Sequence, residues 1–309
     1  MSRRRDTGPA MDRRQRVLNF VQPRGRIGVE IGPLTRPLIL KSESEVLYAD
    51  HMSTEALRHH YRSHSTLGPE GIDGVVPVDL VLGEGGLPQA LGTRGPVDYI
   101  VASHVVEHLP DPIGWLAEGA EVLREGGLFC LIVPDKRFTF DHFRTPTSVG
   151  AVVAAHLQRL RHPPLSIVYE HFARATAIDR RAVWQGRPAS IRPLTGGPEA
   201  ALEATARIAE HGVYVDVHCT VFTPFSFGTV LAEVLGLGLL PFECAALEPT
   251  CPMGDEFFVL LRKRSDRTPA ERAASVPRLD PRRHDALPSP KLTARLAVAA
   301  RRFRGRGAP

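Results

Sequence analysis

The chain has 309 residues, of which 43% are hydrophobic and 24% are charged, as in an ordinary globular protein with a sizeable core. The net charge of +5 comes from the two ends, because residues 1–26 and 262–309 carry 8 and 14 Lys/Arg against 2 and 4 Asp/Glu, and the middle is acidic. An acidic middle would repel a polyanion, so we expect no specific nucleic acid partner and only weak contact of the basic ends with an anionic membrane surface.

Strand and helix patterns alternate after the basic N-terminal segment, residues 1–26. The predicted elements are a strand at Ile27–Ile31, a strand at Glu45–Ala49, a helix at Ser53–Tyr61, a strand near Val75–Val81, a strand at Val97–Ser103, a helix at Asp111–Gly127 and a strand at Leu128–Val133. Asp111 is a good N-cap for its helix, and Gly126 and Gly127 are a typical stop signal. This alternation predicts an α/β fold with a doubly wound parallel sheet.

The alternation lapses between residues 136 and 220. Helical patterns at Val149–Arg161, Leu165–Ala177 and Pro198–His211 predict a largely helical insertion after the fifth strand, serving as a lid or an acceptor-binding region. A helix near Pro224–Leu237 and strands near Leu239–Ala246 and Glu256–Arg264 complete the domain, which we place at residues 27–264. Residues 265–309 are rich in Pro and Arg, and we expect a largely disordered tail with one short amphipathic helix at Lys291–Arg304.

The chain lacks the usual signals for export. Its most apolar stretch, residues 230–242, contains Glu233 and Pro241 and is too short to span a bilayer. No apolar run follows the arginines at positions 3–5, so we find no signal peptide. The four cysteines have no CxxC spacing and suggest reduced thiols. We therefore expect a cytoplasmic protein.

The loop after the first strand, "EIGPLTRP" at residues 30–37, indicates the kind of cofactor. Ligands of doubly wound sheets lie beyond the carboxyl ends of the strands. A dinucleotide needs several glycines and a free helix N-terminus for its pyrophosphate, whereas this loop offers Gly32 alone and then Pro33, which lacks an amide donor. S-adenosylmethionine carries no phosphate. It needs only close backbone approach at Gly32 and an acid, Glu30, facing its ammonium group directly or through water.

Acidic residues after the next strands fit the adenosine part of the same cofactor. Asp50 ends the second strand about 20 residues beyond the loop, where an acid accepts hydrogen bonds from the ribose hydroxyls. Asp79 and Glu84 are candidates to accept from the adenine amine. The remaining predicted cofactor contacts are His51, Met52, Ser103 and His104, with Leu82 as an apolar neighbour.

The segment "DYIVASHVVEHLPDPIGWLAEGAEVLREGGLFCLIVPD", residues 98–135, resembles the class I S-adenosylmethionine-dependent methyltransferases of the small-molecule group. With the opening loop and Asp50, the resemblance spans residues 27–135. It implies a Rossmann-like, seven-stranded, mostly parallel sheet with one reversed strand, a cofactor lined by Glu30, Gly32 and Asp50, and Ser103 and His104 beside the sulfonium. The continuation at 133–147 is similar to bacterial members linked to cell-surface saccharide or natural-product biosynthesis. The single glycine departs from the family pattern.

Two histidines are candidate general bases. His104 directly follows the fourth strand, and His218, which we expect Asp216 to orient, is the second choice. Glu107 and His108 are interpreted as helix-capping residues at a turn. Asp135, Asp141 and His142 form a weak candidate metal set, and we expect no metal.

These features predict methylation of a hydroxyl on a small molecule or a saccharide-linked acceptor. The segment Asp/Asn-Pro-Pro-Tyr/Phe, which enzymes that methylate exocyclic or amide nitrogens usually keep after the fourth strand, is missing, and this favours oxygen or carbon. One alternative is a catalytically degenerate methyltransferase fold that acts as a binding or scaffold protein, which the single-glycine loop supports. A weaker alternative is an RNA methyltransferase.

Overall fold

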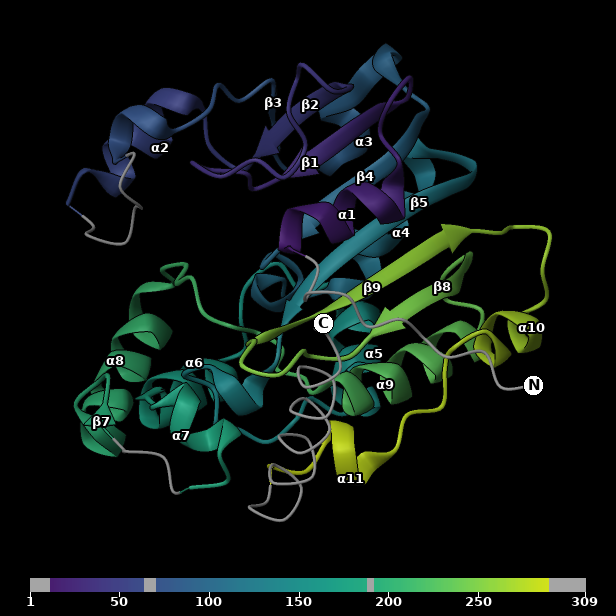
Figure 1. The fold of residues 1–309 in the computed structure, drawn as a ribbon. Helices are drawn as coiled ribbons and strands as arrows, with labels where there is room; N and C mark the ends of the chain where they lie inside the picture. The colour runs from purple at the N-terminus through teal and green to yellow at the C-terminus, as the bar shows by residue number, and fades with distance from the viewer. Residues whose placement is uncertain (1–11, 64–70, 188–191, 289–309) are drawn as a thin grey trace, which may run out of the picture.

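The computed structural model describes residues 12–63, 71–187 and 192–288 and shows one seven-stranded sheet between layers of helices (Figure 1). The strand order is β3-β2-β1-β4-β5-β9-β8. The strands are β1 Ile27–Ile31, β2 Glu45–Asp50, β3 Leu80–Val81, β4 Val97–Ser103, β5 Leu123–Pro134, β8 Phe242–Glu248 and β9 Glu256–Lys263. In this sheet, β9 runs antiparallel to its neighbours β5 and β8, and the other strand pairs that the structure describes are parallel. The predicted doubly wound, mostly parallel sheet with one reversed strand is confirmed.

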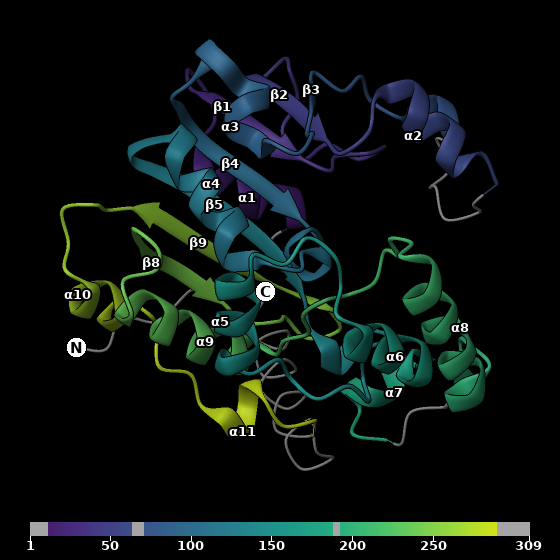
Figure 2. The same ribbon diagram turned by 180° about the vertical axis from the view of Figure 1, so that it is seen from behind.

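Helices lie on both faces of the sheet (Figures 1 and 2). A separate apolar cluster covers each face. Ile100 and Val101, neighbours on β4, lie in different clusters, because successive side chains of a strand point to opposite faces. Helices α3, α4, α5 and α9 pack on the Ile100 face, and α1 packs on the Val101 face. The helices around this sheet are α1 Arg13–Val21, α2 Thr54–His60, α3 Gly86–Leu91, α4 Pro112–Val122, α5 Val149–Gln158 and α9 Pro224–Gly236. Short 3₁₀ turns lie at Tyr61–Ser63, Ile72–Gly74, Gly92–Arg94, Val106–His108 and Lys136–Phe138.

The connection from β1 to β2, residues 32–44, is irregular throughout and contains no helix. Pro33 and Pro37 explain this, since each removes an amide donor and disfavours helical backbone in the residue before it. Leu38 and Ile39 of this loop are buried on the Val101 face of the sheet. No helix N-terminus therefore follows the first strand, where a pyrophosphate would need one.

Helix α1 covers the part of the sheet that the loop leaves open. Val17 and Val21, one helical turn apart, are fully buried in the same cluster as Leu38 and Ile39. We expected residues 1–26 to lie ahead of the domain. The structure corrects this for residues 13–21, which form part of the domain core.

The region between β5 and α9 is mainly helical. After α5, the chain forms α6 Leu165–Arg174, β6 Thr176–Ala177, α7 Arg180–Trp184, β7 Arg192–Pro193 and α8 Gly197–His211. Helices α6 and α8 pack against each other, and β6 pairs with β7. Figure 1 shows α6, α7 and α8 grouped beyond the carboxyl ends of the parallel strands, on the side where ligands of such sheets bind.

Residues 265–288 are ordered, in contrast to the expected disordered tail. They form α10 Pro269–Ala274 and α11 Pro281–His284. Ser275 Oγ accepts a hydrogen bond from the Cys244 amide at 2.8 Å, and Arg137 Nη1 donates to the carbonyls of Arg283 and Ala286. The amphipathic helix predicted at Lys291–Arg304 lies outside the described residues. Every helix that the structure describes falls short of the length and apolarity needed to cross a bilayer.

Candidate active site

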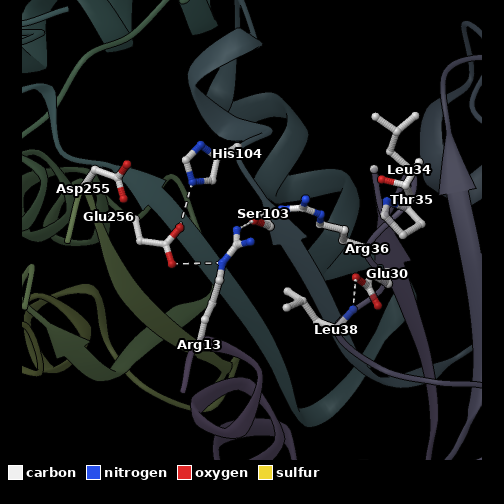
Figure 3. A pocket seen from close by; sticks show the side chains of 12 residues that line it. Arg13, Glu30, Leu34, Thr35, Arg36, Leu38, Ser103, His104, Asp255 and Glu256 are labelled. Atoms are coloured by element: carbon white, nitrogen blue, oxygen red, sulfur yellow. Dashed lines mark hydrogen bonds and ion pairs between the residues drawn. The ribbon is translucent and has the colours of Figure 1, made fainter. Parts of the chain in front are cut away.

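A pocket of about 640 Å³ opens at the carboxyl ends of β1 and β4 (Figure 3). It is lined by Arg13, Glu30, Gly32, Pro33, Leu34, Thr35, Arg36, Leu38, Ser103, His104, Asp255 and Glu256. Four residues predicted from the sequence, Glu30, Gly32, Ser103 and His104, thus share one cavity. The pocket also combines carboxylates with guanidinium groups.

Glu30 organises the loop that forms one wall of the pocket. Its side chain is buried and accepts hydrogen bonds from the amides of Leu38 and Ile39 at 2.8 and 3.0 Å. Burial raises the pKa of Glu30 to about 7, although these amide hydrogen bonds and the charges of nearby arginines act in the opposite direction. Gly32 follows with a φ of +69°, a left-handed conformation that favours glycine.

Arg13 of α1 reaches into the same pocket. Its Nε lies 2.9 Å from Glu256 Oε1, and its Nη2 donates a hydrogen bond to Ser103 Oγ (Figure 3). We missed this residue because we interpreted residues 1–26 as a basic segment outside the domain. The signal that could have revealed it is the helical spacing of Val17 and Val21, which predicts a helix with one buried face.

His104 lies between two carboxylates. Its Nε2 is 2.9 Å from Glu256 Oε2, and its Nδ1 is 3.6 Å from Glu107 Oε1. The side chain is 40% exposed and lines the pocket. The backbone has a φ of +54°, which is uncommon for histidine, and the His104 amide donates to the Ile132 carbonyl of β5.

The predicted adenosine contacts lie outside this pocket. Asp50 is buried at the end of β2, and its Oδ1 is 2.7 Å from both the amide and the Nδ1 of His51. Met52 follows at the same turn. Asp79 accepts from the Tyr48 amide and pairs with Lys41, so its carboxylate serves the pairing of β2 with β3. Glu84 is exposed on the turn before α3.

A second polar cluster lies next to the pocket, around the turn after β4. Glu107 is 1% exposed, and neither carboxylate oxygen has a hydrogen-bond partner among the described residues. The rings of His108 and His218 meet edge to face with centroids 4.7 Å apart. One donor atom each from Glu107, His108 and His218 lie within 4.8 Å of one another.

The histidine partners differ from the expected ones. His218 Nδ1 lies 2.5 Å from Asp141 Oδ2, and Asp216 Oδ1 instead lies 2.7 Å from His108 Nδ1. The predicted Asp216–His218 pair is therefore wrong. Burial opposes the charged form of His108, but the hydrogen bond to Asp216 and the charge of Glu107 raise the pKa of this imidazole above its ordinary value.

Buried hydrogen bonds hold this cluster together. The amides of Cys219 and Thr220 donate to the Glu107 carbonyl, which joins the end of the insertion to the turn after β4. Arg144 Nη1 donates to both Asp141 Oδ1 and the His218 carbonyl, at 2.9 and 2.8 Å.

Asp135, Asp141 and His142, the weak candidate metal set, each contact other protein groups instead of sharing one site. Asp135 is paired with Arg137 and accepts from Thr250, and His142 Nδ1 contacts the Arg137 carbonyl. Asp141 is held by Arg144 and His218.

The polar groups of the pocket fit S-adenosylmethionine. Asp255 and Glu256 supply negative charge for an ammonium or sulfonium, and Arg13 and Arg36 supply positive charge for a carboxylate. The loop after β1 has neither the helix N-terminus nor the repeated glycines that a pyrophosphate requires.

Comparison with known proteins places the chain among methyltransferases. The model of a family described as methyltransferase domain matches residues 15–186. Among solved structures, the chain is similar to the carbon methyltransferase CurJ (14% identity, 78% of this chain and 49% of that chain, TM-score 0.37). It is also similar to an S-adenosylmethionine-dependent methyltransferase from Methanosarcina mazei (15% identity, 80% of this chain and 96% of that chain, TM-score 0.40). A third similar structure is the glycopeptide N-methyltransferase MtfA complexed with sinefungin (12% identity, 80% of this chain and 91% of that chain, TM-score 0.38). The chain thus spans about half the length of the CurJ chain.

No curated protein matches the chain at a significant level. The family match extends from α1, through the opening loop and the turn after β4, into the helical insertion. It covers more than half of the sequence, and the chain therefore belongs to the methyltransferase domain family, as a class I methyltransferase whose cofactor is S-adenosylmethionine.

Proposed function

We propose that the chain methylates a hydroxyl group of a small molecule or a saccharide-linked acceptor, with His104 as the proton acceptor. The observation that carries this proposal is the position of His104 on the wall of the pocket, between Glu256 and Glu107. A partly exposed imidazole can take a proton from an incoming hydroxyl, and the two carboxylates would stabilise the imidazolium that forms.

Glu30, Gly32, Ser103 and Arg13 are the residues that would hold the amino-acid end of S-adenosylmethionine. Bound there, this cofactor supplies a methyl group activated by its sulfonium. Because the sulfonium is already a good leaving group, the work left to the chain is to align the acceptor oxygen and to accept its proton. Asp50, at the end of the neighbouring strand β2, remains our candidate for the ribose hydroxyls.

The turn after β4 favours oxygen over nitrogen as the acceptor atom. Its residues, Ser103-His104-Val105-Val106, differ from the Asp/Asn-Pro-Pro-Tyr/Phe segment described above. A histidine at the first turn position provides a base, which an alcohol needs as the methyl group arrives. The helices α6 to α8, beyond the same sheet edge, are the region where we place the acceptor (Figure 1).

The test uses S-adenosylmethionine labelled in its methyl group and matched acceptors, namely sugars and phenols with free hydroxyls and the same scaffolds with amines instead. We expect label on hydroxyl oxygen, identified by mass spectrometry. Transfer to the amines alone would contradict the proposal. Isothermal titration with the cofactor is run in parallel, since absence of binding heat would favour the scaffold alternative.

A further inference from the structure

Glu107 has a buried carboxylate without a matching donor. Its side chain is 1% exposed, and both oxygens lack hydrogen-bond partners in the part of the chain that the structure describes. The nearest imidazole nitrogens that it faces are His104 Nδ1, at 3.6 Å, and His108 Nε2, at 4.0 Å, both beyond hydrogen-bond distance. Buried carboxylates in proteins are normally hydrogen-bonded, paired with a cation or bound to a metal, so this arrangement indicates a missing ligand.

The imidazoles of His108 and His218, which both lie near Glu107, are oriented in the way that metal ligands usually are. His108 uses Nδ1 for Asp216, at 2.7 Å, and His218 uses Nδ1 for Asp141, at 2.5 Å. These contacts leave Nε2 of each ring for another ligand. A metal-binding histidine almost always donates its second ring N–H to a carboxylate, a carbonyl or a water, which fixes its tautomer and its orientation.

The cluster is held as a rigid unit. The Glu107 carbonyl accepts hydrogen bonds from the amides of Cys219 and Thr220. Arg144 donates to both the Asp141 carboxylate and the His218 carbonyl. The ligand atoms from two distant parts of the chain are therefore held within 4.8 Å of one another by the backbone as well as by side chains. A site that is organised before its ligand arrives loses less entropy on binding.

We propose that Glu107, His108 Nε2 and His218 Nε2 bind one divalent transition-metal cation. Two imidazoles and one carboxylate suit Zn²⁺, Mn²⁺ or Co²⁺, whereas Mg²⁺ and Ca²⁺ favour sites made of oxygen. Three protein ligands leave at least one coordination position for a water or an acceptor oxygen. This revises the expectation that Glu107 and His108 only cap a turn.

The role of the site in turnover rests on the proposed function, whereas the binding of metal does not. A cation at this place, beside His104, would lower the pKa of a coordinated hydroxyl and hold its oxygen.

The experiment strips the full chain of metal with a chelator, removes the chelator, and titrates Co²⁺ while visible absorption is recorded. Metal content after dialysis against Zn²⁺ is measured by mass spectrometry. We expect one ion per chain. Glu107→Gln and His218→Ala should each weaken Co²⁺ binding at least about 100-fold, and Asp216→Asn about 10-fold, because Asp216 acts through His108. His156→Ala is the matched control, since its ring pairs with Asp111 outside the cluster and Co²⁺ binding should stay unchanged.

Asp216 is 67% exposed on its side chain, so Asp216→Asn provides a readout even if a buried variant fails to fold. Absence of Co²⁺ and Zn²⁺ binding in the original chain, or equal binding by all variants, would overturn the site. These measurements need neither cofactor nor acceptor. They therefore still test the metal site if the chain turns out not to methylate hydroxyl groups. If metal binds but its removal leaves turnover unchanged, the site stands and its role in turnover is overturned.

Discussion

The Arg13 guanidinium, from the helix that precedes the sheet, lies 2.9 Å from the Glu256 carboxylate at the start of the reversed strand β9. This contact brings two ends of the domain together at the candidate pocket, where Glu256 also contacts His104 (Figure 3). Arg13 and His104 are therefore connected through one carboxylate. The arrangement suggests separate tests for cofactor binding and for proton transfer.

Arg13→Ala should weaken S-adenosylmethionine binding about 10- to 100-fold, which corresponds to the loss of one charge-assisted hydrogen bond. Isothermal titration measures this change. Arg14→Ala is the control, because Arg14 lies on the same helix but pairs with Glu43 and does not line the pocket. Equal affinities of the two variants would show that Arg13 does not contact the cofactor.

His104→Asn should lower turnover at least about 100-fold while S-adenosylmethionine binding changes only slightly, because the variant removes the proton acceptor and little else. Asparagine is preferred to alanine here, since it tolerates the φ of +54° at this position. Turnover and cofactor affinity must both be measured. If affinity falls in parallel with turnover, His104 has a structural role; if turnover is kept, the acceptor needs no base at this position.

Asp50→Ala and Asp79→Ala should have different effects. Asp50→Ala should weaken cofactor binding about 10- to 100-fold through the lost hydrogen bonds to the ribose. Asp79→Ala should leave binding nearly unchanged and lower the free energy of unfolding by about 1–3 kcal/mol, because the Tyr48 amide loses its acceptor. Calorimetric binding and denaturant unfolding separate the two. The reverse pattern would reinstate Asp79 as a cofactor contact.

Glu30 should make the free energy of unfolding depend on pH. Its pKa is about 7 in the folded protein, against an ordinary value of 4.5 for a glutamate, so the folded state holds a proton that the unfolded state releases between these values. The contribution of Glu30 to stability is therefore greatest below pH 4.5 and is lost as the pH rises to about 7. The loss is on the order of 3 kcal/mol. Denaturant unfolding of the original chain and of Glu30→Gln at several pH values tests this, since the difference between them should change across that window. A constant difference would contradict the raised pKa.

Removal of residues 269–309 should lower the melting temperature by several degrees, in contrast to what a disordered tail implies. The truncation takes away the Ser275 hydroxyl that accepts from the Cys244 amide and the carbonyls that accept from Arg137, whose side chain is buried. Removal of residues 289–309 alone is the comparison, because it takes away none of these contacts. Equal melting temperatures for both truncations would show that the contacts contribute nothing.

The succession of strands and helices along the chain, and the sheet edge that carries the candidate site, were predictable from the sequence. Buried parallel strands such as Val97–Ser103 are nearly continuous apolar runs, and the turn residues that follow them mark the ligand-binding edge. Glu30, Gly32, Ser103 and His104 could therefore be assigned to one edge, and the structure brings all four to one pocket. These signals are local, because each depends on residues within a few positions of one another.

The partners of the buried charges were decided only by the tertiary structure. Asp216 seemed suited to His218 because they are two positions apart, yet Asp216 contacts His108, 108 residues away, and His218 contacts Asp141, 77 residues away. Arg13 likewise reaches Glu256 across nearly the whole domain. Hydrogen bonding of a buried polar group depends on which groups the packed backbone brings within about 3 Å, and sequence spacing carries no information about contacts of this kind.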